Sequence, residues 1–196
     1  MFNVLLDPLP HTWNGYEVDM DFQTGIQISQ CMTDEELTNV ERLTTAMMLM
    51  FPDESNRPVD AQEVSEALVW YMNGWNHDNI SEGKKKKETI LMDFDIDQWR
   101  IYAAFKRQYG IDLNRQKLHF WVYMGLLTNL EECSFTRVIS IRDKKIDSKM
   151  SREEKAAISK AKKMYAIKKE ESETEEEAVE RELAIDEFNK LRAKSR

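Results

Sequence analysis

The chain has 196 residues, of which 41% are hydrophobic and 33% are charged, and its net charge is −8. This composition supports one ordinary hydrophobic core and leaves a highly charged remainder. Residues 1–142 contain 13 basic and 22 acidic residues, whereas residues 143–196 contain 15 basic and 14 acidic residues. The acidic balance of the front part argues against nonspecific attraction of the protein to DNA or to an anionic membrane, and only a local basic patch could reverse this.

The distribution of aromatic residues divides the chain into two parts. All five tryptophans lie within the first 121 residues, and Tyr165 and Phe188 are the only aromatics after residue 142. We therefore predict a mainly α-helical globular domain over residues 1–142 and a charged helical extension over residues 143–196. No apolar stretch approaches the ~20 residues of a membrane helix and no signal peptide is visible. We expect a cytoplasmic protein with no membrane partner and with Cys31 and Cys133 reduced.

The N-terminal region predicts a small β-hairpin followed by a helix. Asn14-Gly15 lies between two short runs of mixed polarity, and this pair favours the positive φ angles of a tight hairpin turn. Helical periodicity begins at Asp21, and Thr33-Asp34-Glu35-Glu36 has the composition of a helix N-cap. We predict a helix from this cap to about residue 50, ending before Pro52.

A second helix is predicted between Asp60, as its N-cap, and Gly74, as its stop. Residues 76–90 follow without apolar periodicity and predict an exposed linker. This linker contains the run Lys84-Lys85-Lys86-Lys87.

Aromatic residues at helical spacing mark the next helix, which we expect to end at Gly110. We interpret this aromatic stripe as core rather than as a platform for stacking nucleic-acid bases. Residues 118–130 are apolar nearly all round, which is typical of a helix at the centre of a core. Residues 135–141 are too few to decide between helix and strand. The aromatic stripe consists of Trp99, Tyr102, Phe105 and Tyr109.

The C-terminal region predicts two successive helices of opposite charge. Ser151-Arg152-Glu153-Glu154 is a capping-box pattern. Residues 144–169 contain ten basic and three acidic residues, and residues 170–196 contain ten acidic and five basic residues. We expect the break between the two helices near residues 170–174.

No pattern of residues predicts catalysis, a metal site or a cofactor. The acids Asp93, Asp95 and Asp97 begin like a calcium loop, but Gln98 and Ala104 stand where that loop needs glycine and a bidentate glutamate. We interpret these acids as caps of a helix N-terminus.

The glycines and histidines also give no indication of a catalytic, metal or cofactor site. The six glycines form neither a phosphate-binding loop nor a nucleophile elbow, and His11, His77 and His119 have no metal-ligand spacing. We interpret His119 as a hydrogen-bonded core histidine and Met47, Met48 and Met50 mainly as core residues. We expect a binding protein and not an enzyme.

Two groups of residues are candidates for partner binding. The first is the basic segment, which fits nucleic acid, an intramolecular hairpin or a solvated helix face. The second is the thin apolar stripe of the last helix. The candidates are Lys144, Lys145, Lys149, Arg152, Lys160, Lys162, Lys163, Val179, Leu183, Phe188 and Leu191.

Several motifs, in their order along the chain, resemble the bacteriophage gene-product-fifteen family over roughly residues 1–169. The motifs are Asp21-Phe22-Gln23-Thr24-Gly25-Ile26, Met92-Asp93-Phe94-Asp95-Ile96-Asp97, Ile101-Tyr102-Ala103-Ala104-Phe105, Gln108-Tyr109-Gly110-Ile111-Asp112-Leu113, Leu118-His119-Phe120-Trp121 and Val138-Ile139-Ser140-Ile141-Arg142-Asp143.

The resemblance implies a protein of the tail-gene region of siphophages and prophages. By position and size, such a protein looks like a tail assembly chaperone that binds the tape measure protein and tail tube protein, self-associates, and is absent from the mature virion. The alternatives are a DNA-associated phage factor using residues 144–169 and a minor structural tail component. In this setting the Lys84–Lys87 run has two interpretations, an ordinary linker or the site of a ribosomal frameshift.

Overall fold

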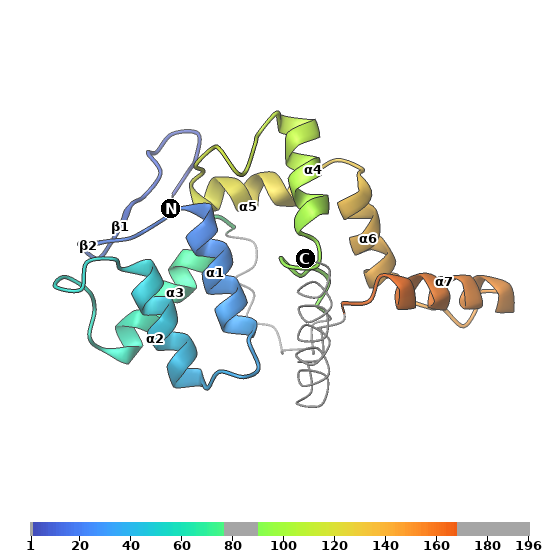
Figure 1. Cartoon of the computed structure of the whole chain (residues 1–196), viewed down its shortest axis with the longest axis horizontal. Coiled ribbons are helices and arrows are strands. Elements are labelled where there is room, and N and C mark those ends of the chain that lie inside the picture. The colour runs from blue at the N-terminus through green and yellow to red at the C-terminus, as the bar shows by residue number, and fades with distance from the viewer. Residues whose placement is uncertain (1, 77–89, 168–196) are drawn as a thin grey trace, which may run out of the picture. The chain divides into compact units, whose positions relative to one another are not determined.

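The computed structural model describes residues 2–76 and 90–167, which form a two-stranded hairpin and seven α-helices (Figure 1). The predicted fold class, mainly α with a small N-terminal hairpin, is confirmed. The predicted linker with Lys84–Lys87, and the predicted last helix with its candidates Val179, Leu183, Phe188 and Leu191, lie outside the described residues. The elements are β1 (Thr12–Trp13), β2 (Tyr16–Glu17), α1 (Phe22–Thr33), α2 (Asn39–Met50), α3 (Ala61–Asn73), α4 (Gln98–Tyr109), α5 (Phe120–Thr128), α6 (Ser134–Asp143) and α7 (Arg152–Met164).

The hairpin turns at the predicted Asn-Gly pair. Strands β1 and β2 are antiparallel, with Trp13 opposite Tyr16. Asn14 and Gly15 have φ angles of 48° and 90°, which few residues other than asparagine and glycine adopt readily. The tight turn brings the Trp13 and Tyr16 rings into a stacked arrangement with centroids 6.5 Å apart.

The N-cap predicted at Thr33–Glu36 is wrong. Thr33 is the last residue of α1, which begins after the N-cap Asp21 and buries Ile28 on its inner face. The cap of α2 is Thr38: its hydroxyl accepts from the Glu41 backbone N–H at 3.3 Å, and the Glu41 carboxylate accepts from the Thr38 N–H at 2.8 Å. Thr33 and Thr38 both have a glutamate three residues later, so local spacing could not choose between them. As predicted, α2 ends at Met50.

Helices α3 and α4 begin and end where their predicted boundary residues stand. The Asp60 carboxylate accepts from two N–H groups of the first turn of α3. Gly110 ends α4 with a left-handed φ of 70°. Gly74, which follows α3, has a right-handed conformation that any residue could adopt. Glycine is needed there because a side chain has no room: a Cβ would lie 2.3 Å from a ring carbon of Trp121.

The undecided segment 135–141 is helical, as part of α6. The predicted capping box of α7 is confirmed, with reciprocal hydrogen bonds between Ser151 and Glu154 of 2.8 and 3.1 Å. Helix α7 packs against α6 within a compact unit that runs from Met1 to Tyr165. The division of the chain predicted at residue 142 stays a prediction, because more than half of the segment 143–196 lies outside the described residues.

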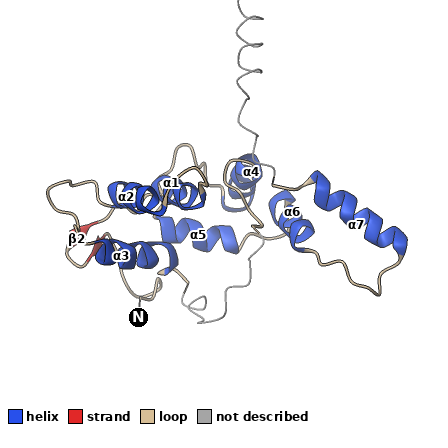
Figure 2. Ribbon diagram, turned by 90° about the horizontal axis from the view of Figure 1, so that it is seen from below, coloured by secondary structure: helices blue, strands red, loops and turns tan. Residues whose placement is uncertain are grey.

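Helix α5 lies at the centre of the core, as its apolar sequence predicts. Figures 1 and 2 both place it between α3 and α4. Phe120 stacks on Tyr71 of α3 with ring centroids 5.2 Å apart, and Tyr123 stacks on Phe105 of α4 at 5.1 Å. All four rings are at most 1% exposed. Among the described residues, no helix is both long enough and apolar enough to cross a membrane.

Candidate partner-binding groove

Two of the sequence motifs meet where α1 and α5 begin. The Phe22 N–H donates to the carbonyl oxygen of Leu118 at 2.9 Å, and the Phe120 N–H donates to that of Met20 at 2.6 Å. Gly25 permits close packing, because a Cβ at this position would lie 2.1 Å from the Phe120 ring. The backbone bonds and this contact fix α1 against α5.

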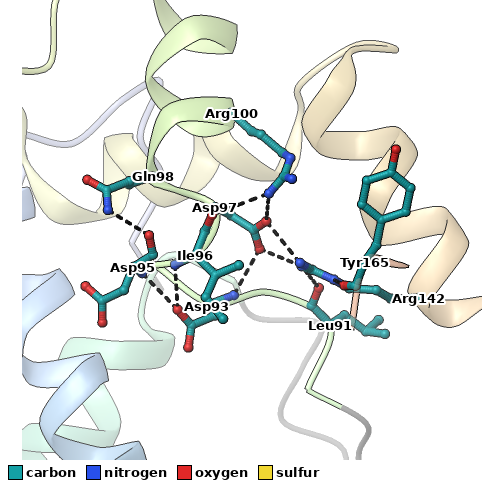
Figure 3. Close-up of polar contacts among 9 residues, drawn as sticks. All are labelled: Leu91, Asp93, Asp95, Ile96, Asp97, Gln98, Arg100, Arg142 and Tyr165. Carbon is teal, nitrogen blue, oxygen red and sulfur yellow. Dashed lines mark hydrogen bonds and ion pairs between the residues drawn. The ribbon is translucent and has the colours of Figure 1, made fainter. Parts of the chain in front are cut away.

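Two further motifs meet in a buried ion pair between the start of α4 and the end of α6 (Figure 3). Arg142 Nη1 lies 2.5 Å from Asp97 Oδ2, and Nη2 lies 3.1 Å from Oδ1. The two side chains are 5% and 0% exposed. Two parallel charge-assisted hydrogen bonds are the geometry in which a guanidinium binds a carboxylate most strongly.

Arg142 also binds two distant carbonyl oxygens. Its Nη1 donates to Leu91 O at 2.9 Å, and its Nε donates to Tyr165 O at 2.6 Å (Figure 3). Arg142 therefore connects the segment before α4, the start of α4 and the residue after α7. Asp97 accepts further from Arg100 Nη1 at 2.8 Å.

The predicted role of the aspartates as helix caps needs correction. Asp97 stands at the N-cap position of α4, but its carboxylate makes no capping hydrogen bond, because it is turned toward Arg142. Asp93 instead closes the preceding turn by accepting from the N–H groups of Asp95 and Ile96, both at 2.9 Å. Within the described residues, no three His, Cys, Asp or Glu side chains are placed to hold a metal ion.

A groove of about 530 Å³ lies between α1 and α4. Its floor consists of buried apolar side chains, Phe22, Ile101 and Tyr123. Burial raises the pKa of the Tyr123 hydroxyl, so this floor stays uncharged. The walls add Gln23, Ile26, Gln27, Gln30, Phe94, Asp95, Gln98, Trp99, Tyr102, Leu113 and Asn114.

Amide groups dominate the polar rim of the groove. Asp95 is the only charged residue in its lining of described residues, and its carboxylate accepts from Gln30 Nε2 at 2.7 Å. Trp99 is 73% exposed. An apolar floor, amide donors and acceptors, and an exposed indole suit an apolar peptide segment, since amides pair with its backbone and the indole packs on its side chains.

The core interpretation of the aromatic stripe is confirmed for Phe105, which is fully buried, and is wrong for Trp99. The two are six positions apart in the sequence, which places Trp99 about 120° from Phe105 around the helix axis. That angular offset is the sequence signal that could have identified the groove. Of the methionines interpreted as core, Met50 is buried, whereas Met48 is 53% exposed.

The predicted basic candidates do not line the groove. They lie on α7 and in the segment before it, and Lys162 Nζ donates to the carbonyl oxygen of Lys144 at 2.8 Å. The structure thus separates two surfaces, a groove with one charged residue in its described lining and a basic helix. Those exposed to solvent are Lys144, Lys145, Lys149, Arg152, Lys160 and Lys163.

His119 is hydrogen-bonded as predicted, but it is the N-cap of α5 and not part of the helix itself. Its Nδ1 accepts from the Trp121 N–H at 3.1 Å, so Nε2, 2.9 Å from Pro10 O, carries the proton and donates. Burial lowers the pKa of His119, and the neighbouring His11 lowers it further. The neutral ring is therefore the form that caps α5.

We expect the protein to lose stability in acid through this histidine. Because the pKa of His119 is lower in the folded chain, the unfolded chain takes up the proton first as the pH falls below about 6.5. Its contribution is thus complete above that pH and is lost below it. Urea midpoints at pH about 8 and about 5 measure the loss, and His119→Asn, which keeps a capping oxygen, should show a smaller difference. An equal difference in both proteins would contradict this role.

The groove and the ion pair lie inside a region that matches a known family. A family model described as Bacteriophage Gp15 protein matches residues 5–167. No curated protein and no solved structure matches the chain. The matched region includes every helix described above.

Proposed function

The chain belongs to the bacteriophage Gp15 family, and from this membership we propose that it is a tail assembly chaperone. In this role it binds the tape measure protein and the tail tube protein during tail morphogenesis, without catalysing a reaction. It acts in the host cytoplasm and leaves before the virion is complete. The groove between α1 and α4 is the observation that carries the proposal.

The groove suits a client that displays apolar side chains along an extended or helical segment. Its floor is apolar, its single charged residue is already paired with Gln30, and Trp99 projects from its edge. A client with an apolar stripe would therefore enter without leaving a buried charge unpaired. Such contacts exchange readily, as transient assembly requires.

Co-expression tests the proposed function directly. The full chain should keep the tape measure protein of its own phage soluble, and affinity capture should recover the two together. Failure of both results would overturn the proposal. Mass spectrometry of purified particles separates a chaperone from a minor structural tail component, because a chaperone should be absent from them.

We expect Trp99→Ala to weaken capture of the tape measure protein by about tenfold or more, because the exposed indole supplies a large apolar contact at the groove. Quantitative pull-down or calorimetry measures the change. The matched control is Val69→Ala on α3, which also removes an exposed apolar side chain, 60% exposed, but lies outside the groove. Equal capture by the wild type and both variants would exclude the groove as the client site.

A DNA-associated factor is the competing function, and the exposed basic residues of α7 favour it. Such a factor would bind duplex DNA with an affinity that falls steeply with salt. Neutralising Lys160 and Lys163 would abolish that binding. A tail chaperone should retain client capture in the same variant.

A further inference from the structure

Helix α7 presents a face that nothing among the described residues covers. It packs on α6, its half-buried residues include Ile158 and Ala161, and none of its residues is fully buried. Met164 is 67% exposed. The outward face therefore combines small apolar side chains with basic ones. It consists of Arg152, Glu153, Ala156, Ala157, Lys160, Lys163 and Met164, three cations and one acid among its charged residues.

Helix α2 presents an exposed apolar stripe within a segment of opposite charge. Val40, Thr44 and Met48 follow one another at four-residue spacing on its exposed side, and Val40 and Met48 are 75% and 53% exposed. Residues 34–54 around this stripe contain six acidic residues and one basic residue, Arg42. The Arg42 guanidinium is already bonded to a backbone carbonyl of the same segment.

The two helices are similar in length, both expose apolar side chains, and the chain segments that contain them carry opposite charge. Helices α2 and α7 have 12 and 13 residues, which makes each about 18–20 Å long. Both faces are exposed within one chain, and Figures 1 and 2 both draw the two helices far apart in the unit Met1–Tyr165. We propose that α7 of one copy docks on α2 of a second copy of this chain. The contact joins two different surfaces, so copies assemble head to tail.

The apolar residues favour a protein partner over nucleic acid. A phosphate backbone pairs with Lys160 and Lys163 but makes no apolar contact with Met164 or with the alanines of the same face. Val40 and Met48 of a second copy can make such contacts. The acidic residues that precede and follow α2 in the segment 34–54, together with Glu41, supply the complementary charge. This association does not depend on the tail chaperone function.

Sedimentation velocity of the full chain tests the proposal through two complementary variants. Lys160→Glu/Lys163→Glu removes the basic face, and Val40→Lys/Met48→Lys places cations on the α2 face. We expect the wild type to associate, more than about tenfold more weakly in about 0.5 M than in about 0.05 M salt. Each variant alone should be monomeric. An equal mixture should form a 1:1 dimer, because one variant keeps an intact α2 face and the other keeps an intact α7 face.

A matched control carries the same change of charge elsewhere. Arg107→Glu/Lys117→Glu reverses two exposed cations outside both faces and should associate like the wild type. Circular dichroism confirms that every variant is folded. A monomeric wild type, variants that associate like the wild type, or a mixture that stays monomeric would each overturn the proposal. Binding of duplex DNA by a monomeric wild type, lost in Lys160→Glu/Lys163→Glu, would overturn it in favour of a DNA-associated factor.

Discussion

We expect Arg142→Ala to lower the free energy of unfolding by about 3–5 kcal/mol. The substitution removes the two hydrogen bonds that Arg142 gives to the fully buried Asp97 carboxylate and leaves it with Arg100, which is 32% exposed, as its remaining guanidinium partner. It also removes the donors to the carbonyl oxygens of Leu91 and Tyr165. Guanidinium chloride denaturation at neutral pH measures the loss.

A second arginine on the same helix provides the control. Arg137 pairs with Glu132 at 3.0 Å, but both side chains are exposed, at 68% and 81%. Water and salt screen such a pair, so Arg137→Ala should change the free energy of unfolding by about 0–1 kcal/mol. Equal losses for the two alanine variants would show that the buried ion pair contributes no more to the free energy of unfolding than the exposed one.

Gly25→Ala is expected to lower the free energy of unfolding by about 1–3 kcal/mol. Alanine is the better helix former by about 1 kcal/mol, so an open site in α1 would gain stability. Here the added Cβ would lie 2.1 Å from the Phe120 ring, and α1 would have to move away from α5. Thermal or urea denaturation gives the sign of the change.

Gly125→Ala is the matched substitution without that contact. Gly125 lies within α5, and a Cβ added there meets nothing within 4 Å. We expect it to raise the free energy of unfolding by about 0.5–1 kcal/mol. The two glycine variants should therefore shift stability in opposite directions, and a shared direction would refute the assigned role of Gly25.

Features set by a few neighbouring residues could be predicted from the sequence. Asn14-Gly15 fixes a turn through its own backbone preferences, and Ser151 with Glu154 forms a cap within a single helical turn. Gly110 ends α4 for the same local reason. The resemblance to the Gp15 family is also confirmed, since it rests on motifs read directly from the residues.

Features that depend on distant packing could not be predicted. Asp97 and Arg142 are 45 residues apart, and nothing near either residue identifies its partner. The sequence shows Gly74 as a helix stop but not the Trp121 ring that requires it. The groove likewise needs α1 and α4 side by side. The basic residues that we predicted as candidates for partner binding lie on α7 and just before it, not in the groove.

The position of Arg142 has a consequence for the order of folding. Its side chain binds residues 45, 51 and 23 positions away, so it closes three large loops at one point. Closing such loops costs chain entropy before any contact compensates for it. We infer that these bonds form after the helices, and that the loss in Arg142→Ala appears mainly as faster unfolding. Arg142 thus contributes little to the rate of folding and mainly slows the unfolding of the native protein.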